Sequence, residues 1–292
     1  MPPYTFKLSQ KKNTTQEPSS PEPPLLEITD LKQHFTLESN FLQQVFTRQE
    51  QSVIKAVDGV SFSLQAGEIF GLVGESGCGK STLSRTILQL MRATSGSVKL
   101  DGTELTSLST AQVRDLRQKM QMIFQDPLAC LNPLMTIGEG IADPLYIHHL
   151  AKPEDARKRV EAMLEKVGLT PVEDYYHRYP RELSGGQQQR VAIARALITQ
   201  PKLLICDEPV SMLDASIQTQ VLDLMQALKK EFHLTYLFIT HDLWVARFLC
   251  DRIAVMNAGK IVEMGETQQL FASPQHPYTK KLLNAAPLLA KS

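Results

Sequence analysis

The glycine-rich stretch that begins at Gly74 restricts the fold of this 292-residue chain more than any other segment. It reads GESGCGKS, which matches the pattern G-x-x-x-x-G-K-[ST], and it lies between the apolar run EIFGLVG and the helix-forming run TLSRTILQL. Glycines in such a loop let successive N–H groups point at phosphate oxygens, and the helix that follows adds its positive N-terminal end. The sequence therefore predicts a phosphate-binding strand–loop–helix unit made of Gly74, Glu75, Ser76, Gly77, Cys78, Gly79, Lys80, Ser81 and Thr82.

The sequence predicts a separate role for each of three residues in this loop. Lys80 is placed to reach the β- and γ-phosphates of a bound nucleotide, and Ser81 to supply a hydroxyl to Mg²⁺. Cys78 occupies a variable position of the pattern, where a tolerated small side chain is a better interpretation than a redox sensor. The alternative for the whole stretch is a glycine-rich turn that matches the pattern by chance.

A pair of acidic residues follows another apolar run. The segment LLICDEP places Asp207 at the end of a predicted strand, where it can hold Mg²⁺ through water. Glu208 beside it is the candidate base that orients and activates the attacking water. Adjacent acids could instead only begin a turn, but a phosphate loop in the same chain favours the catalytic interpretation. Together the two elements predict a nucleoside-triphosphate hydrolase.

Short apolar runs alternate with amphipathic segments from Leu25 onward, which predicts an α/β fold with a largely parallel sheet. The region 126–195 is mostly helical and is interpreted as an insertion into that sheet. Residues 1–24 contain six prolines and few large apolar groups, so we expect a disordered leader there. Strands are predicted at 25–31, 57–64, 68–74, 120–124, 203–206 and 236–240, hairpins at 97–105 and 253–265, and helices at 152–167, 187–199 and 218–231.

Composition argues against several other classes of protein. The 31 basic and 31 acidic residues balance, unlike those of a mainly electrostatic nucleic-acid binder. No stretch approaches the roughly 18 apolar residues of a membrane span, and the N-terminus lacks the apolar core of a signal peptide. The four cysteines have neither CxxC spacing nor a histidine cluster, so reduced thiols are predicted rather than zinc ligands or disulfides. We therefore expect a cytosolic protein without a nucleic-acid partner.

A third motif begins at Leu183 and reads LSGGQ, followed by QQRVAIARAL. Beside a phosphate loop and a strand-end Asp-Glu pair, it resembles the signature sequence of ATP-binding-cassette (ABC) ATPases. The resemblance covers about residues 25–290 and implies a P-loop NTPase fold. That fold has a RecA-like, mainly parallel sheet, an antiparallel β subdomain and an inserted α-helical subdomain at about 126–195. It implies one ATPase domain over 25–285 and a C-terminal extension over 266–292.

The resemblance also implies a dimer. Glycines and a serine at a helix start form an anion site, and this would be the second such site in the chain. In the ABC family, the signature of one subunit closes over the γ-phosphate held by the other, which requires a two-fold or pseudo-two-fold pair. Asp214, in SMLDAS, resembles the loop that couples the two sites. The residues implied for this cross-chain contact are Ser184, Gly185, Gly186, Gln187 and Asp214.

Other family positions match one at a time. Gln125, in MIFQDP, corresponds to the glutamine that contacts Mg²⁺ and water, and His241, in FITHD, to the histidine that contacts the γ-phosphate. Phe35, in LKQHF, is the candidate aromatic that stacks on adenine, with His34 or an ordinary core role for Phe35 as alternatives. The guanine-reading motif Asn-Lys-x-Asp does not occur, so the expected ligands are ATP and Mg²⁺.

Three segments resemble the ATPases of oligopeptide, dipeptide and nickel importers: LVGESGCGKSTL, FQDPLACLNPLMTI and the tail SPQHPYTKKLLNAAP. Residues 36–55 also look like the insertion of that branch. No cysteine follows Cys250, as in the type without a C-terminal cysteine cluster, which implies pairing with a different ATPase subunit; a homodimer stays open. The tail could instead be only a packing extension.

The resemblance implies that ATP-driven dimer closure powers the uptake of oligopeptides or dipeptides through two transmembrane permease subunits. An extracytoplasmic solute-binding protein would deliver the substrate, and this chain would lie at the cytoplasmic face of the plasma (inner) membrane as a peripheral subunit. Three alternatives remain open: an importer ATPase for nickel or another small solute, a soluble ABC ATPase that acts on ribosomes or DNA, and a subunit that binds ATP without hydrolysing it. The presence of Glu208 and His241 argues against the last.

Overall fold

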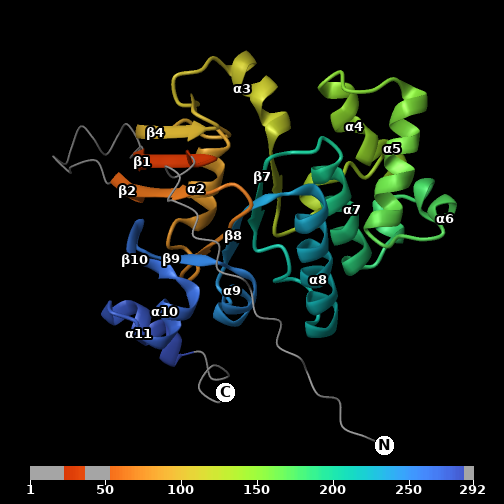
Figure 1. Ribbon diagram of the computed structural model, residues 1–292. Coiled ribbons are helices and arrows are strands. Elements are labelled where there is room, and N and C mark those ends of the chain that lie inside the picture. Colours follow the sequence, from red (N-terminus) through yellow and green to blue (C-terminus); the bar gives the residue numbers. More distant parts are fainter. Residues whose placement is uncertain (1–22, 37–52, 286–292) are drawn as a thin grey trace, which may run out of the picture.

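The computed structural model describes residues 23–36 and 53–285, which form two sheets and the helices that cover them (Figure 1). Most of the predicted leader (1–24) and of the predicted insertion (36–55) lies outside the described residues, as do residues 286–292 of the C-terminal extension. Within the described ranges, no helix combines the length and the apolar character needed to cross a membrane.

The larger sheet contains β3 (Ile69–Val73), β6 (Met120–Ile123), β7 (Leu203–Asp207), β8 (Thr235–Thr240), β9 (Arg252–Asn257) and β10 (Lys260–Glu266). The strand order is β10-β9-β3-β8-β7-β6, and every neighbouring pair except β9 and β10 is parallel. The strands β3, β7 and β8 are buried along their full length, which explains why each forms a continuous apolar run in the sequence. The predicted α/β fold with a largely parallel sheet is confirmed.

The smaller sheet contains β1 (Leu26–Thr36), β2 (Val53–Leu64), β4 (Ser95–Leu100) and β5 (Thr103–Glu104). It is antiparallel, with the order β2-β1-β4-β5. The β4–β5 hairpin turns at Asp101 and Gly102, whose φ angles are 52° and 74°. A two-residue turn with both φ angles positive suits an Asp-Gly pair, as the sequence predicts.

The helices are α2 (Lys80–Ile87), α3 (Thr110–Leu116), α4 (Ile137–Ile147), α5 (Pro153–Lys166), α6 (Val172–Tyr176), α7 (Gly185–Leu197), α8 (Ala215–Phe232), α9 (Leu243–Leu249), α10 (Thr267–Ala272) and α11 (Pro277–Asn284). The helices predicted at 152–167 and 218–231 are confirmed as α5 and α8. The one predicted at 187–199 begins two residues earlier, because the side chain of Ser184 caps α7 and lets it start at Gly185. Helices α4 to α7 lie on the side of the large sheet away from the small sheet (Figure 1).

Alternate residues of the central strands pack into two hydrophobic clusters. On β3, Ile69 and Val73 join the cluster that contains the helices α4 to α8, whereas Phe70 and Leu72 join the cluster that contains the small sheet. The first cluster extends from the large sheet into the helical region 126–195, so the predicted insertion shares a core with the sheet. That the region 126–195 is a separate subdomain stays a prediction.

Candidate functional site

The predicted phosphate loop connects the end of β3 to the start of α2. Two of its glycines lie too close to neighbouring backbone to carry a side chain. A Cβ on Gly79, whose φ is 109°, would lie 2.0 Å from the carbonyl oxygen of Ala56. A Cβ on Gly74 would lie 2.3 Å from the carbonyl oxygen of Met256. The loop is therefore a backbone cradle at a helix N-terminus, which is the geometry that binds phosphate oxygens.

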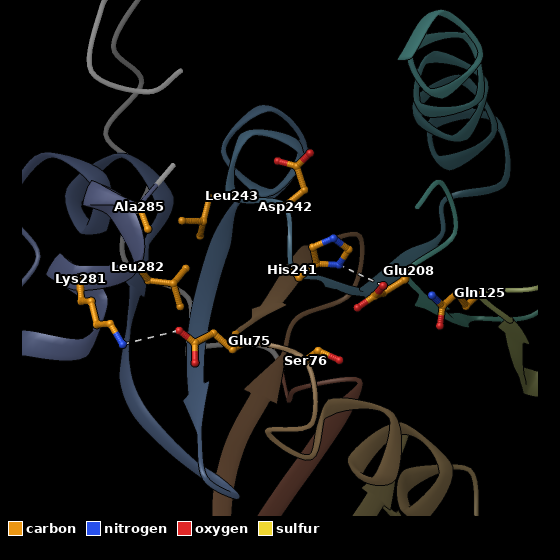
Figure 2. A pocket seen from close by; sticks show the side chains of 11 residues that line it. Glu75, Ser76, Gln125, Glu208, His241, Asp242, Leu243, Lys281, Leu282 and Ala285 are labelled. Atoms are coloured by element: carbon orange, nitrogen blue, oxygen red, sulfur yellow. Dashed lines mark ion pairs between the residues drawn. The ribbon is translucent and has the colours of Figure 1, made fainter. Parts of the chain in front are cut away.

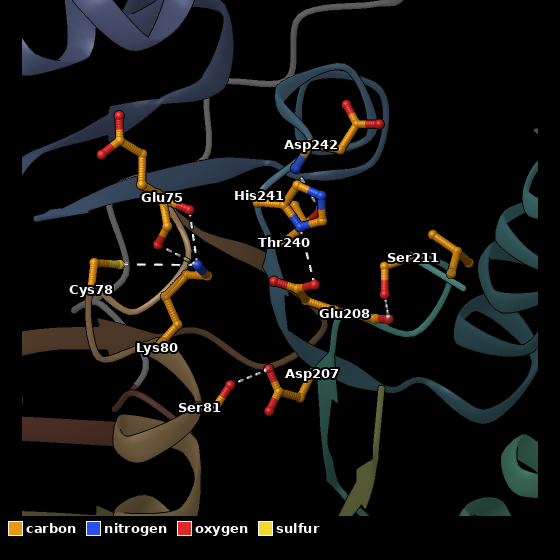
Figure 3. A network of polar contacts seen from close by, with 12 residues as sticks. Glu75, Cys78, Lys80, Ser81, Asp207, Glu208, Ser211, Thr240, His241 and Asp242 are labelled. Atoms are coloured by element: carbon orange, nitrogen blue, oxygen red, sulfur yellow. Dashed lines mark hydrogen bonds and ion pairs between the residues drawn. The ribbon is translucent and has the colours of Figure 1, made fainter. Parts of the chain in front are cut away.

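Lys80 is buried and points back into this loop (Figure 3). Its Nζ donates to the carbonyl oxygens of Gly74, at 2.8 Å, and Glu75, at 3.0 Å. Because both acceptors are uncharged, the positive charge of Lys80 is not neutralised and can attract a phosphate. Cys78 Sγ lies 4.0 Å from the same nitrogen, and burial raises the pKa of this thiol, which keeps it protonated.

Ser81 and Asp207 meet at the end of β7, where the sequence predicts a Mg²⁺ site. Ser81 Oγ donates to Asp207 Oδ1 at 3.1 Å (Figure 3). Burial raises the pKa of Asp207, the hydrogen bond from Ser81 opposes this rise, and the charge of Glu208 adds to it. A bound cation would stabilise the charged form of a carboxylate whose pKa is raised in this way.

The donor set fits Mg²⁺, because this ion prefers oxygen ligands. Ser81 offers a hydroxyl, Asp207 a carboxylate, and Gln125 an amide oxygen at the cavity described below. The described part of the chain contains no group of three or more His, Cys, Asp or Glu side chains that could by itself hold a metal ion. A Mg²⁺ shared with nucleotide phosphates needs only one or two protein carboxylates, so this set is sufficient.

Glu208 and His241 contact each other at the carboxyl ends of β7 and β8. Glu208 Oε2 lies 3.0 Å from His241 Nδ1 (Figures 2 and 3). Glu208 has a φ of 50°, and its N–H donates to the carbonyl oxygen of Ile239 at 2.9 Å. A left-handed backbone costs about 1–3 kcal/mol at a residue with a side chain, and such strain concentrates at functional sites. The fold thus holds a carboxylate in a strained position beside an imidazole, an arrangement suited to general-base chemistry.

A cavity of about 560 Å³ brings distant parts of the chain together (Figure 2). It is lined by Gly74, Glu75, Ser76, Gln125, Glu208, His241, Asp242, Leu243, Lys281, Leu282 and Ala285. The first six of these residues belong to the site predicted from the sequence. The cavity therefore joins the phosphate loop to the candidate base and to the glutamine and histidine that were assigned separately.

The remaining lining residues were not predicted. Asp242 Oδ1 caps α9 by accepting from the N–H of Trp244 at 2.8 Å, and Leu243 belongs to the hydrophobic core. Both line the cavity because they follow His241 directly. Lys281 and Leu282 come from α11, and Ala285 directly follows that helix. The sequence HPYT marks the start of this helix, with Pro277 in its first turn, but no sequence signal indicates which surface the helix contacts.

The signature residues lie away from this cavity. Ser184 Oγ accepts from the N–H of Gln187 at 3.4 Å, and Gln187 Oε1 accepts from the N–H of Ser184 at 2.9 Å, which together cap α7. Ser184 and Gly185 are exposed, and Asp214 is exposed at the start of α8. None of these residues lines the cavity. One chain thus presents a phosphate cradle and, separately, an outward-facing helix N-terminus.

Phe35 and His34 lie near the end of β1, on opposite faces of the strand. His34 Nε2 lies 3.1 Å from Asp58 Oδ1, so a carboxylate holds this ring. Phe35 is half-buried and belongs to neither hydrophobic cluster of the described residues. Neither residue lines the cavity, and the assignment of Phe35 to adenine stays a prediction.

Comparison with protein families gives two matches. Residues 57–211 match the family described as "ABC transporter", and residues 262–292 match the family described as "Oligopeptide/dipeptide transporter, C-terminal region". The chain is 52% identical over 265 residues to the oligopeptide transport ATP-binding protein OppF of Salmonella typhimurium, covering 90% of this chain and 78% of that protein. It is 46% identical over 268 residues to the oligopeptide transport ATP-binding protein AppF of Bacillus subtilis, covering 91% of this chain and 79% of that protein.

Solved structures resemble the fold. The dimeric ATP-binding cassette MJ0796, in a post-hydrolysis state bound to ADP and Pi, aligns with a TM-score of 0.71 and 29% identity. The alignment covers 83% of this chain and 98% of that one. The predicted cassette fold, with its mainly parallel sheet, its antiparallel sheet and its helical insertion, is thereby confirmed.

Proposed function

The chain belongs to the ABC transporter ATP-binding family, and on that premise we propose that it is the ATP-hydrolysing subunit of an importer of oligopeptides or dipeptides. The observation that carries the ATPase assignment is the cavity of Figure 2, where the phosphate loop, Gln125, Glu208 and His241 converge. The peptide substrate is supported by the match of residues 262–292 to the peptide-transporter C-terminal region and by the similarity to OppF and AppF.

In the proposed mechanism, the loop amides and Lys80 bind the phosphates of ATP. Lys80 uses two of its three N–H donors on the loop carbonyls, so the third can bind a phosphate oxygen, which is a stronger partner because it is charged. Ser81, Asp207 and Gln125 would hold Mg²⁺, which when bound neutralises charge on the phosphates. Glu208 orients the attacking water and takes its proton, while His241 fixes the carboxylate through the 3.0 Å contact.

The exposed signature supports a second part of the proposal. Ser184 and Gly185 point outward, so the anion that they bind is held by another subunit. We expect this subunit to be a different ATPase, with a homodimer as the alternative. Closure of the pair on two ATP molecules then drives two transmembrane permeases, and hydrolysis at Glu208 reopens it. In this arrangement the chain is peripheral at the cytoplasmic face of the membrane, and an extracytoplasmic binding protein supplies the peptide.

The test is uptake of a labelled oligopeptide by cells that lack this chain. We expect uptake to be lost, and to be restored by the wild-type chain but not by Glu208→Gln, which should bind ATP yet hydrolyse it about a hundredfold or more slowly. Glu165→Gln, which changes an exposed carboxylate on α5, is the matched control and should restore uptake.

Unimpaired peptide uptake without the chain would overturn the peptide assignment, and a selective loss of nickel uptake would replace it. Purification of the tagged chain from gently solubilised membranes provides an independent measurement. We expect two polytopic membrane proteins and a second ATPase to co-purify. Recovery with ribosomal or DNA-repair proteins instead would overturn the transport function and leave the ATPase assignment intact.

A further inference from the structure

The helix α11 packs against the phosphate loop, although about two hundred residues separate them in the chain. Tyr278 Oη accepts a hydrogen bond from the N–H of Glu75 at 3.2 Å. Lys281 Nζ lies 4.0 Å from the Glu75 carboxylate, and Leu282 lines the cavity from the same helix (Figure 2). The C-terminal extension therefore forms one wall of the nucleotide site, in addition to marking the importer branch.

Tyr278 forms its hydrogen bond with a peptide group that Lys80 also contacts. Gly74 C=O and Glu75 N–H belong to one planar peptide unit. Lys80 Nζ donates to its oxygen at 2.8 Å (Figure 3), and Tyr278 Oη accepts from its nitrogen. A cation on the oxygen polarises the unit and strengthens the hydrogen bond at the nitrogen. The first peptide unit of the loop is thus fixed at both ends.

The position of Tyr278 is itself set by contacts that do not involve the loop. Glu263 on β10 accepts hydrogen bonds from the N–H of Gln275, at 2.7 Å, and of His276, at 3.0 Å. His276 Nδ1 then caps α11 by accepting from the N–H of Tyr278 at 3.2 Å. The ring of Tyr278 and the side chain of Leu282 also pack against the hydrophobic cluster that includes the large sheet. These contacts anchor the helix to the sheet independently of the phosphate loop.

We propose that Tyr278 is a positioning residue of the nucleotide site, whose hydroxyl holds the Gly74–Glu75 peptide unit while Lys80 also binds the phosphates. This inference rests on the proposed ATP site. A phosphate would compete with the Gly74 carbonyl oxygen for the Lys80 ammonium and would weaken one of the two anchors of the peptide unit. Tyr278 keeps the other, so the loop retains its shape and less ordering accompanies binding. Tyr278 touches neither substrate nor water in this role and acts through the loop.

The test is Tyr278→Phe in the full chain, which keeps the ring and removes the hydrogen-bond acceptor. We expect affinity for trinitrophenyl-ATP and the KM for ATP to worsen about three- to tenfold, while kcat changes less than about twofold. The matched control is Tyr146→Phe on α4, whose side chain is exposed and does not line the site.

Unchanged affinity and KM in Tyr278→Phe would overturn the inference, as would a fall in kcat with KM unchanged. Equal losses in Tyr146→Phe would also overturn it. Lys80→Ala in the same binding assay separates this inference from the proposed function. If Lys80→Ala loses affinity and Tyr278→Phe does not, only the role of Tyr278 fails. If Lys80→Ala binds the probe as well as the wild type does, the proposed ATP site itself fails.

Discussion

Asp207 carries a charge in surroundings that disfavour it. Burial raises its pKa, the hydrogen bond from Ser81 opposes the rise, and the charge of Glu208 adds to it. The folded chain therefore binds this proton more tightly than the unfolded chain does. As a consequence, folding stability decreases as the pH rises from 3.8, the ordinary pKa of aspartate, through the raised pKa of Asp207 in the folded chain. The residue that we propose as a Mg²⁺ ligand is therefore one that the fold holds more easily as a neutral group.

We expect Asp207→Asn to melt at a higher temperature than the wild-type chain at pH 7.5 without nucleotide, and the difference to shrink toward pH 4. The amide oxygen can still accept from Ser81, so the local contact persists. Hydrolysis of Mg-ATP should fall about a hundredfold or more, because a metal ligand is lost. Thermal unfolding across pH and ATP turnover measure the two effects. The control is Asp223→Asn, an exposed residue on α8; a lower melting temperature for Asp207→Asn at every pH would contradict the argument.

At the scale of single residues, the motifs predicted which side chains could form the site but not the conformations and contacts that position them. The spacing of Lys80, Ser81 and Asp207 predicted chemistry, and the structure brings Ser81 and Asp207 within hydrogen-bond distance. The left-handed backbone of Glu208 and the contact of Tyr278 with the loop had no local signal. Both result from packing between distant segments, which periodicity and spacing do not report.

The connection between β10 and α11 depends on one carboxylate. Burial raises the pKa of Glu263, but hydrogen bonds from the N–H groups of Gln275 and His276 outweigh this, and the net pKa lies below the usual 4.5. A carboxyl group whose pKa is lowered on folding contributes stability that is complete above pH 4.5. That contribution to stability is lost as the pH falls through the lowered pKa of Glu263.

We therefore expect Glu263→Gln to loosen α11 at neutral pH, because an amide accepts hydrogen bonds more weakly than a carboxylate. Limited proteolysis at pH 7.5 should cleave the chain beyond residue 266 several-fold faster than in the wild type, and fluorescent ATP should bind more weakly. Near pH 3.5 the local difference should narrow, which hydrogen exchange at α11 would measure. The control is Glu266→Gln, an exposed carboxylate at the end of the same strand. Equal protection of α11 in both variants at neutral pH would rule out this role of Glu263.

Most strands and long helices could be predicted from the sequence, since each is an apolar run or an amphipathic repeat. The sequence could not predict which residues of a central strand face which of the two hydrophobic clusters. On β3 both faces are buried and every residue is apolar, so no polar residue marks the alternation between the clusters. The start of α7 was placed too late because glycines at 185 and 186 disfavour helix until the Ser184 cap is counted.

The whole molecule presents two candidate anion sites, and the second lies outside the cavity that contains the first. The phosphate loop lies in the cavity with Glu208, whereas Gly185 lies at the exposed start of α7. This separation is the structural reason to expect a second subunit. It was anticipated from the resemblance to ABC ATPases, and the described residues add that the second site is accessible.

We expect Gly185→Asp to leave folding and ATP binding by the chain intact and to reduce turnover by the assembled transporter at least about tenfold. A Cβ at Gly185 would make only ordinary contact, 3.7 Å from Leu213 Cδ2, so the substitution fits sterically. The added negative charge would repel the phosphate that the other subunit holds. Gly185→Ala is the control and should retain most turnover. Nucleotide binding and ATPase assays on both forms measure this, and full activity of Gly185→Asp in the complex would argue against a cross-subunit role.

The contact between Glu75 and Tyr278 also has a consequence for biosynthesis. The two residues are 203 positions apart, and ribosomes add roughly 5–20 residues per second, so synthesis of the intervening chain takes on the order of ten to forty seconds. During that interval the phosphate loop exists without the tyrosine that holds its first peptide unit. The nascent chain passes through this stage with an incomplete nucleotide pocket, and the pocket matures only after Tyr278 has left the ribosome.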